Sequence, residues 1–142
     1  MTPQRITMIT LAVADLERSR RFYAKLGWEE AEGGNDVIAF YKITGQFFAL
    51  YSKDALISDL GMPIHERSTG TITLATNYAS AKDVDRAFAD AVKAGAIVIT
   101  KPKEVFWGGY SGNFADPDGH LWEVAHNPFW ALDDTGQIVG NA

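Results

Sequence analysis

The chain contains the same strand-like motif twice, at matching places in two similar halves. Residues 9–13 are ITLAV and residues 72–76 are ITLAT. After each motif the sequence predicts a helix that ends at a glycine, followed by three short strands. A five-residue match alone would be weak evidence, but the shared order of elements indicates a duplicated βαβββ module. We therefore predict an α+β fold built from two modules, at about residues 5–52 and 70–127.

Both predicted helices carry start and stop signals. The first runs from Asp15, which can cap its N-terminus, to about Leu26, before Gly27. The second starts at Ser80, where Asp83 three residues on resembles a capping box. Gly95 ends that helix. The apolar faces are expected to consist of Leu16, Phe22, Tyr23 and Leu26 in the first helix and Val84, Ala87, Phe88, Ala91 and Val92 in the second.

Turn residues divide the rest of each half into strands. The predicted strands are 28–32, 36–43 and 46–52 in the first half and 96–100, 104–114 and 120–126 in the second. The breaks in the second half are Lys101-Pro102 and the tight turn Asp116–Gly119. An irregular connector at 53–69 joins the modules, and a tail follows at 128–142. We predict that residues 1–142 form a single domain.

Side-chain alternation predicts which face of each module meets its helix. In the first strand Ile9, Leu11 and Val13 form an aliphatic row, which is the natural partner of the helix. The opposite row contains Met8, Thr10 and Ala12, and its counterpart in the second half contains Thr71, Thr73 and Ala75. We expect these smaller, more polar rows to line a cavity inside a curled mixed sheet, with the helices outside; exposure to solvent is the alternative.

Composition excludes several classes of function. A net charge of −5 argues against nucleic acid as a partner, because binding to phosphates requires a basic patch. No stretch is as long and apolar as a membrane span, and the N-terminus lacks the apolar core of a signal peptide. The absence of cysteine excludes disulfides and thiolate chemistry. We therefore expect a cytoplasmic protein that does not bind membranes.

Two motifs carry a resemblance to a known family. The segments ITLAVADLERSRRFYAKLGW near the start and SGNFADPDGHLWEV near the end resemble the vicinal oxygen chelate superfamily. This superfamily includes glyoxalase I, extradiol dioxygenases, fosfomycin-resistance enzymes and bleomycin-resistance proteins. The resemblance covers about residues 5–127 and implies paired βαβββ modules around a cavity, usually in a homodimer. The apolar residues Phe129 and Trp130 are expected to cover a sheet edge or to contact that second subunit.

The resemblance also implies four positions for metal ligands. They fall on Met8, on or next to Ala49, on Thr71 and on Glu123. Methionine is a soft thioether, threonine is a weak neutral donor and alanine has no donor, so Glu123 alone can bind a divalent cation well. A catalytic metal generally needs three protein ligands. We therefore expect no metal and no other cofactor.

The three histidines do not rebuild such a site. His120 and His126 share a strand face, but they lie six residues apart, about 20 Å along a strand. Both are expected to point away from Glu123. His65 lies in the irregular connector.

Glu123 is the most informative residue that remains. As a general base it would need a tuning partner and a substrate proton within reach. As a polar anchor for strands or for a ligand it needs only donors, and Thr10, Thr71 and Thr73 are candidates. We favour the polar anchor and keep catalysis by Glu123 as the alternative.

Aromatic residues suggest the walls of a pocket. Trp107 and Tyr110 lie in VFWGGYSGNF, whose glycines permit a bulge or a close approach of a ligand. Phe47 is a third candidate wall, in the same alternating row as Ala49. Core packing is the alternative for these rings. Trp122, Phe22 and Phe88 are assigned to the core on the helix side.

These observations predict a metal-free protein that binds, and sequesters, a small planar organic molecule. Phe47, Thr10, Thr71, Thr73, Trp107, Tyr110 and Glu123 are the candidate ligand-binding residues. The alternative is a lyase, isomerase or dioxygenase-type enzyme that uses Glu123 or a relocated metal site. A module that binds no ligand and serves only a structural or partner-binding role is the third possibility.

Overall fold

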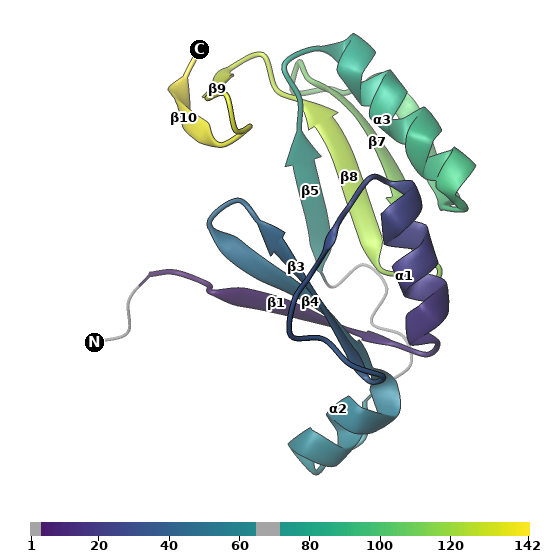
Figure 1. Cartoon of the computed structure of the whole chain (residues 1–142). Helices are drawn as coiled ribbons and strands as arrows, with labels where there is room; N and C mark the ends of the chain where they lie inside the picture. The colour runs from purple at the N-terminus through teal and green to yellow at the C-terminus, as the bar shows by residue number, and fades with distance from the viewer. Residues whose placement is uncertain (1–3, 65–71) are drawn as a thin grey trace. The chain divides into compact units, whose positions relative to one another are not determined.

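The computed structural model describes residues 4–64 and 72–142. These residues belong to two compact units, Met1–Glu66 and Arg67–Ala142. The first unit contains β1 (Met8–Val13), α1 (Leu16–Lys25), β2 (Glu30–Ala31), β3 (Ile38–Ile43), β4 (Gln46–Ser52) and α2 (Lys53–Leu60). The second contains β5 (Thr73–Asn77), α3 (Ala81–Ala94), β6 (Ile97–Glu104), β7 (Tyr110–Ala115), β8 (Leu121–His126), β9 (Trp130–Leu132) and β10 (Ile138–Asn141) (Figure 1). The α+β class and the two βαβββ modules are confirmed.

Each module has its own mixed sheet of four strands. The strand order is β1-β4-β3-β2 in the first sheet and β5-β8-β7-β6 in the second. In both sheets the first strand of the module pairs in parallel with the last, and the other pairs are antiparallel. The expected curled sheet is therefore two separate four-stranded sheets, and neither closes on itself. None of the helices that the structure describes is long and apolar enough to span a bilayer.

Helix α1 begins and packs as its sequence predicts. The Asp15 carboxylate caps it by accepting a hydrogen bond from the Arg18 backbone N–H at 3.0 Å. Phe22 and Tyr23 are buried against the sheet. The Tyr23 ring lies 5.4 Å from Phe48 and 6.1 Å from Tyr41, centroid to centroid. Burial of these aromatic rings stabilises this unit.

Ser80 caps helix α3 as predicted. The Ser80 Oγ accepts from the Asp83 backbone N–H at 3.2 Å, and the Ser80 hydroxyl donates to the Asp83 carboxylate. Val84, Phe88 and Ala91 are buried as predicted. The prediction for Val92 is wrong, because its side chain is exposed on the flank of the helix.

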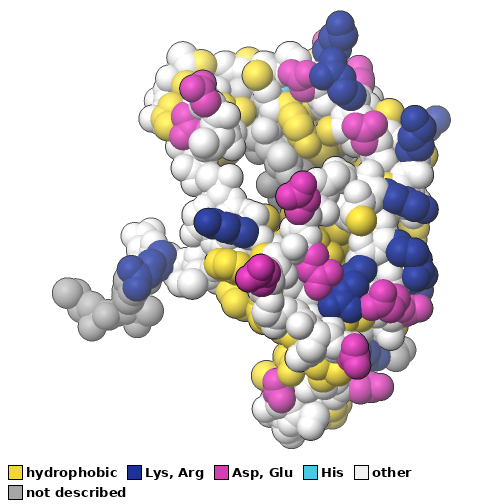
Figure 2. All heavy atoms as spheres, in the orientation of Figure 1, with side chains coloured by type: hydrophobic (Ala, Val, Ile, Leu, Met, Phe, Trp, Pro, Cys, Tyr) yellow, Lys and Arg dark blue, Asp and Glu magenta, His cyan; other side chains and the backbone are white. Residues whose placement is uncertain are grey.

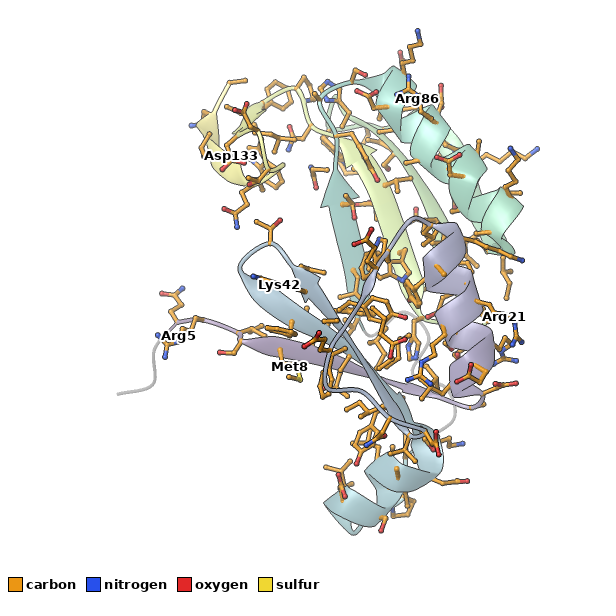
Figure 3. All side chains as sticks on the ribbon, in the orientation of Figure 1. Arg5, Met8, Arg21, Lys42, Arg86 and Asp133 are labelled. Carbon is orange, nitrogen blue, oxygen red and sulfur yellow. The ribbon has the colours of Figure 1, made fainter. Side chains whose placement is uncertain are left out.

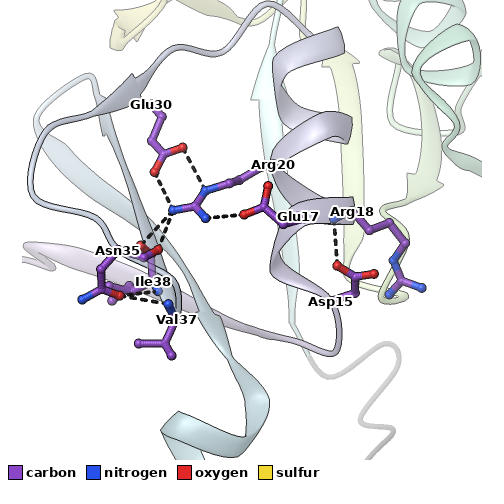
Figure 4. A network of polar contacts seen from close by, with 8 residues as sticks. All are labelled: Asp15, Glu17, Arg18, Arg20, Glu30, Asn35, Val37 and Ile38. Carbon is purple, nitrogen blue, oxygen red and sulfur yellow. Dashed lines mark hydrogen bonds and ion pairs between the residues drawn. The ribbon is translucent and has the colours of Figure 1, made fainter.

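Arg20 ties α1 to the β2–β3 region in a way that the sequence did not reveal (Figure 4). Its guanidinium donates two parallel hydrogen bonds to the Glu30 carboxylate, at 3.0 and 2.9 Å. It also donates to Glu17 at 2.6 Å and to the carbonyl oxygens of Asn35 and Ile38 at 2.8 and 3.3 Å. Planar bidentate contacts of this kind fix geometry as well as contributing energy.

The predicted break at Lys101-Pro102 is wrong. Strand β6 continues through Lys101-Pro102, and the chain turns instead at residues 105–109. Proline is tolerated there because β6 is an edge strand and its register shifts next to Pro102. Gly112 on β7 leaves room for this proline, since a Cβ at Gly112 would lie 2.9 Å from the Pro102 ring.

The connector and the tail are more regular than predicted. Residues 53–60 of the connector form α2, and Gly61 ends this helix in the left-handed conformation. In the tail β9 and β10 form an antiparallel hairpin. The Asp133 carboxylate organises its turn by accepting from the backbone N–H groups of Thr135 and Gln137. Residues 65–71 of the connector, with His65 and Thr71, lie outside the described residues.

Candidate functional site

The first sheet has one face that α1 does not cover. Phe48 and Tyr41 pack against α1, so their strand neighbours at odd spacing point to the opposite face. Three cross-strand rows lie on this face, and the one farthest from Met8 contains Ala12, Tyr51 and Ile38. Met8, Phe47 and Lys42 form one row, and Thr10, Ala49 and Phe40 form the next. We call this surface the open face of the first sheet.

Apolar side chains are unusually exposed on this open face. Met8 is 43% exposed and Phe47 is 37% exposed, although both belong to paired strands. Phe40 is partly buried, while Ala49 between the strands is fully buried. At the far end of the face the Tyr51 hydroxyl donates to Asp59 of α2 at 2.5 Å, which ties that helix to this side of the sheet. The rows nearer to Met8 form a shelf of apolar side chains with the Thr10 hydroxyl at its side.

The second sheet also has a helix-covered face and an open one. The Phe114 ring stacks on Trp122 at 6.4 Å and lies 6.5 Å from Phe88 of α3. Trp122 therefore belongs to the core on the helix side, as predicted. Glu123, its neighbour in the strand, points to the opposite face, the open face of the second sheet.

On this open face Glu123 lies in a row with Ala75 on β5 and Asn113 on β7. Thr73 lies on the same face, one row away, opposite Leu121. Among the residues that the structure describes, the Glu123 carboxylate has no hydrogen-bond or ion-pair partner. Glu123 is only partly buried, so water can solvate the carboxylate without a large desolvation cost.

Trp107 approaches the open face of the second sheet. A Cβ added to Gly109 would lie 2.0 Å from two atoms of the Trp107 ring, so the ring occupies that side of Gly109. Gly109 precedes β7, and the alternation of Ser111 and Asn113 directs this side towards the face of Glu123. The Trp107 side chain is 39% exposed. Ser111 and Ala125, both small and buried, lie in the row between this ring and Glu123.

Tyr110 lies on the other face of the second sheet. Its hydroxyl donates to the Asp85 carboxylate on α3 at 2.6 Å. This hydrogen bond raises the pKa of Tyr110, with a smaller contribution from desolvation. The structure thus separates Tyr110 from Trp107 and Glu123, with which the sequence analysis had grouped it.

The four positions implied for metal ligands supply few good donor atoms. Met8 and Ala49 lie on the open face of the first sheet and Glu123 on that of the second, while Thr71 lies outside the described residues. Of the three described side chains, only the Glu123 carboxylate is a good ligand for a divalent cation. These residues do not fit a catalytic metal.

The two histidines that the structure describes make hydrogen bonds that involve the backbone. His126 Nδ1 lies 2.9 Å from the Tyr78 carbonyl oxygen, and this contact requires the proton on Nδ1. His120 follows the Asp116–Gly119 turn, and its backbone N–H donates to the buried Asp116 carboxylate at 3.0 Å. Within residues 4–64 and 72–142 no three acidic, histidine or cysteine side chains are grouped to hold a metal ion.

Sequence reasoning missed Phe40 and Lys42 as members of the first open face. Phe40 and Lys42 are two residues apart in the predicted strand 36–43, so alternation alone places them on the same side of this strand. Their position beside Phe47 depends on the register across the Thr44-Gly45 turn. The signal was therefore the short hairpin, which fixes that register.

Comparison with known proteins identifies the family. The family model of the glyoxalase/bleomycin resistance protein/dioxygenase superfamily matches residues 5–124. An uncharacterised protein of Mycobacterium bovis is 32% identical over 120 residues, covering 80% of this chain and 78% of that protein. A glyoxalase-related enzyme from Fulvimarina pelagi has a similar crystal structure, with a TM-score of 0.90, 34% identity and coverage of 99% and 100% of the two chains.

A more distant structure shares the fold. Lactoylglutathione lyase from Agrobacterium tumefaciens aligns with a TM-score of 0.68 and 21% identity, covering 93% of this chain and 100% of that one. At this identity the likeness concerns the fold alone.

Proposed function

Because the chain belongs to the glyoxalase/bleomycin resistance protein/dioxygenase superfamily, we propose that it binds a small planar organic molecule without a metal. One observation carries the proposal. The open faces present exposed rings and polar side chains, while the described metal positions supply one carboxylate, a thioether and a methyl group. Such surfaces suit stacking and hydrogen bonding better than metal coordination.

The open face of the first sheet supplies an apolar shelf for a flat ligand. Phe47 and Met8 are paired in register, and Phe40 lies diagonal to Phe47 on β3, with β4 between it and Met8. Aromatic and thioether side chains contact planar ligands favourably, and burying their exposed area would contribute to affinity. The Thr10 hydroxyl adds a donor and an acceptor at the edge of the shelf.

The open face of the second sheet supplies a ring and a carboxylate. Trp107 offers a flat apolar surface, and Glu123 and Asn113 offer polar groups in one row. A ligand with a hydrogen-bond donor or a positive charge would pair with Glu123. We propose Glu123 as a ligand contact, with Thr73 as a neighbouring polar group.

A lyase or isomerase is the second candidate function. It is favoured by the Glu123 carboxylate, which no described residue pairs. A general base must be free to accept a substrate proton, and an unpaired carboxylate meets that requirement. A catalysed reaction would then be lost in Glu123→Gln while ligand binding persists.

We also propose that the protein is a homodimer. Phe129 and Trp130 are exposed at the start of the C-terminal hairpin. Exposed aromatic side chains that are adjacent in the chain are typical of subunit contacts. Sedimentation at micromolar concentration should give about twice the mass of one 15.6 kDa chain, and a single-chain mass would contradict this.

A thermal-shift screen of planar organic compounds tests the binding proposal. A compound that binds the native state raises its melting temperature. Each hit should give a smaller shift in Phe47→Ala or in Trp107→Ala, measured against the ligand-free variant. Phe106→Ala is the matched control, because this ring is fully exposed at the 105–109 turn. The proposal fails when no compound stabilises the protein, or when all three variants respond like the wild type.

A further inference from the structure

Lys42 is the charged strand residue on the open face of the first sheet. Register and alternation put every second side chain of β1, β3, β4 and the short β2 on that face, in successive rows. Among these strand residues Lys42 alone carries a charge at neutral pH. Figure 3 labels Lys42 on β3 and Met8 on β1.

The Lys42 ammonium is not engaged by the protein. Within the described part of the chain it has no hydrogen bond and no ion pair, and its residue is exposed. Arg20 in the same unit shows the contrast, since carboxylates and carbonyl oxygens occupy its guanidinium. The charge of Lys42 is therefore free to meet a ligand.

Lys42 also borders the apolar shelf. It pairs directly with Phe47 across the antiparallel β3–β4 ladder, which puts the two Cβ atoms about 5 Å apart. In Figure 2 a basic side chain borders hydrophobic atoms over the β3–β4 hairpin. The flexible stem of lysine can carry its ammonium over the edge of a neighbouring ring.

We propose that this face selects a planar organic acid, whose carboxylate pairs with Lys42 and whose apolar body rests on Phe47, Phe40 and Met8. The inference rests on the proposed binding function and names the chemical class of its ligand. The single ammonium of Lys42 matches the one charge of a carboxylate. Thr10 lies on β1, with β4 between it and β3, so its hydroxyl can meet only another part of the ligand. A phosphate would require more donors than one ammonium supplies.

Calorimetric titration with two matched probes tests the proposal. Naphthoate and naphthamide share their ring system and differ in the charge of one substituent. The wild type should bind naphthoate about fivefold more tightly than naphthamide, the size of a modest ion pair. Added salt should reduce this preference, because salt screens an exposed pair.

Variants assign the preference to Lys42. Lys42→Met keeps most of the stem and should bring the naphthoate-to-naphthamide ratio close to one, while Lys42→Arg should preserve it. Lys25→Met removes an exposed lysine from the last turn of α1 and should leave the ratio unchanged.

The outcomes separate this inference from the proposed function. If naphthamide binds and Phe47→Ala weakens it, but Lys42→Met leaves the ratio unchanged, the preference for an acid is wrong and the binding shelf stands. If neither probe binds to the wild type, both proposals fail for this face. If Lys42→Met or Phe47→Ala instead changes the sedimentation mass, a second copy of the chain covers this face and the acid is not its occupant.

Discussion

Removing the Arg20 guanidinium should destabilise the protein markedly. Arg20→Met retains the apolar stem but removes the bidentate contact to Glu30 and the contact to Glu17. It also leaves the carbonyl oxygens of Asn35 and Ile38 without this donor. The lost contacts join α1 to the segment from β2 to the start of β3. Their removal should therefore loosen this junction first.

The magnitude follows from how buried these groups are. The Arg20 side chain is 19% exposed, while those of Glu30 and Glu17 are 34% and 67% exposed. The Glu17 contact should therefore contribute little, as surface ion pairs do. The charge-assisted contacts to Glu30 and the carbonyl oxygens are better shielded, and hydrogen bonds to charged groups contribute about 1.5–3 kcal/mol. We expect a total loss of about 2–3 kcal/mol in the free energy of unfolding.

Urea unfolding followed by circular dichroism measures this loss. Arg21→Met is the matched control, because Arg21 is the next residue on α1 and is exposed. Its effect should stay within about 0.5 kcal/mol. The reasoning is refuted if Arg20→Met is as stable as Arg21→Met.

The other predictions concern pH, metal and ligand contacts. Burial raises the pKa of Tyr41 from 10.0 to about 12. The stabilising contribution of the neutral phenol is therefore complete below pH 10 and is lost between pH 10 and 12. In urea titrations over that range, Tyr41→Phe should lose less stability than the wild type. EDTA should leave the melting temperature unchanged and elemental analysis should find no stoichiometric Ni, Zn, Fe or Mn; tight one-to-one metal bound through Glu123 would contradict this. Trp107→Ala should weaken a planar ligand by about 1–3 kcal/mol in calorimetry. Glu123→Gln should weaken cationic ligands more than neutral ones, and equal effects would leave Glu123 a structural residue.

The parts of the fold that depend on local signals could be predicted from the sequence. Asp15, Ser80 and Gly95 mark helix ends through backbone hydrogen bonds or a left-handed conformation. The division of Trp122 and Glu123 between two faces follows from strand geometry alone. Such features need no knowledge of distant contacts.

Features that depend on strand order or on distant partners could not be predicted in the same way. Pro102 indicated a break, but it lies on an edge strand, and edge position is a property of the assembled sheet. Apart from Glu17, the partners of Arg20 lie 10 to 18 residues away. The Tyr110 hydroxyl bonds to Asp85, 25 residues away, on the helix-covered face. Its proximity to Trp107 in the chain therefore did not predict its position.

Helix α2 escaped prediction for a local reason. Its N-cap residue, Ser52, makes no side-chain capping hydrogen bond, and none of its eight residues is fully buried. Apolar periodicity is then too weak to distinguish a short helix from an irregular connector.

A titration with naphthamide, followed by backbone amide resonances in heteronuclear NMR spectra, tests most directly whether the open face of the first sheet binds a planar ligand. Naphthamide carries no charge, so the result does not depend on Lys42. We expect saturable shifts that are largest at Met8, Phe40 and Phe47 and absent at Arg21 and Lys25 on α1. An absence of saturable shifts, or a maximum on α1, would contradict this expectation.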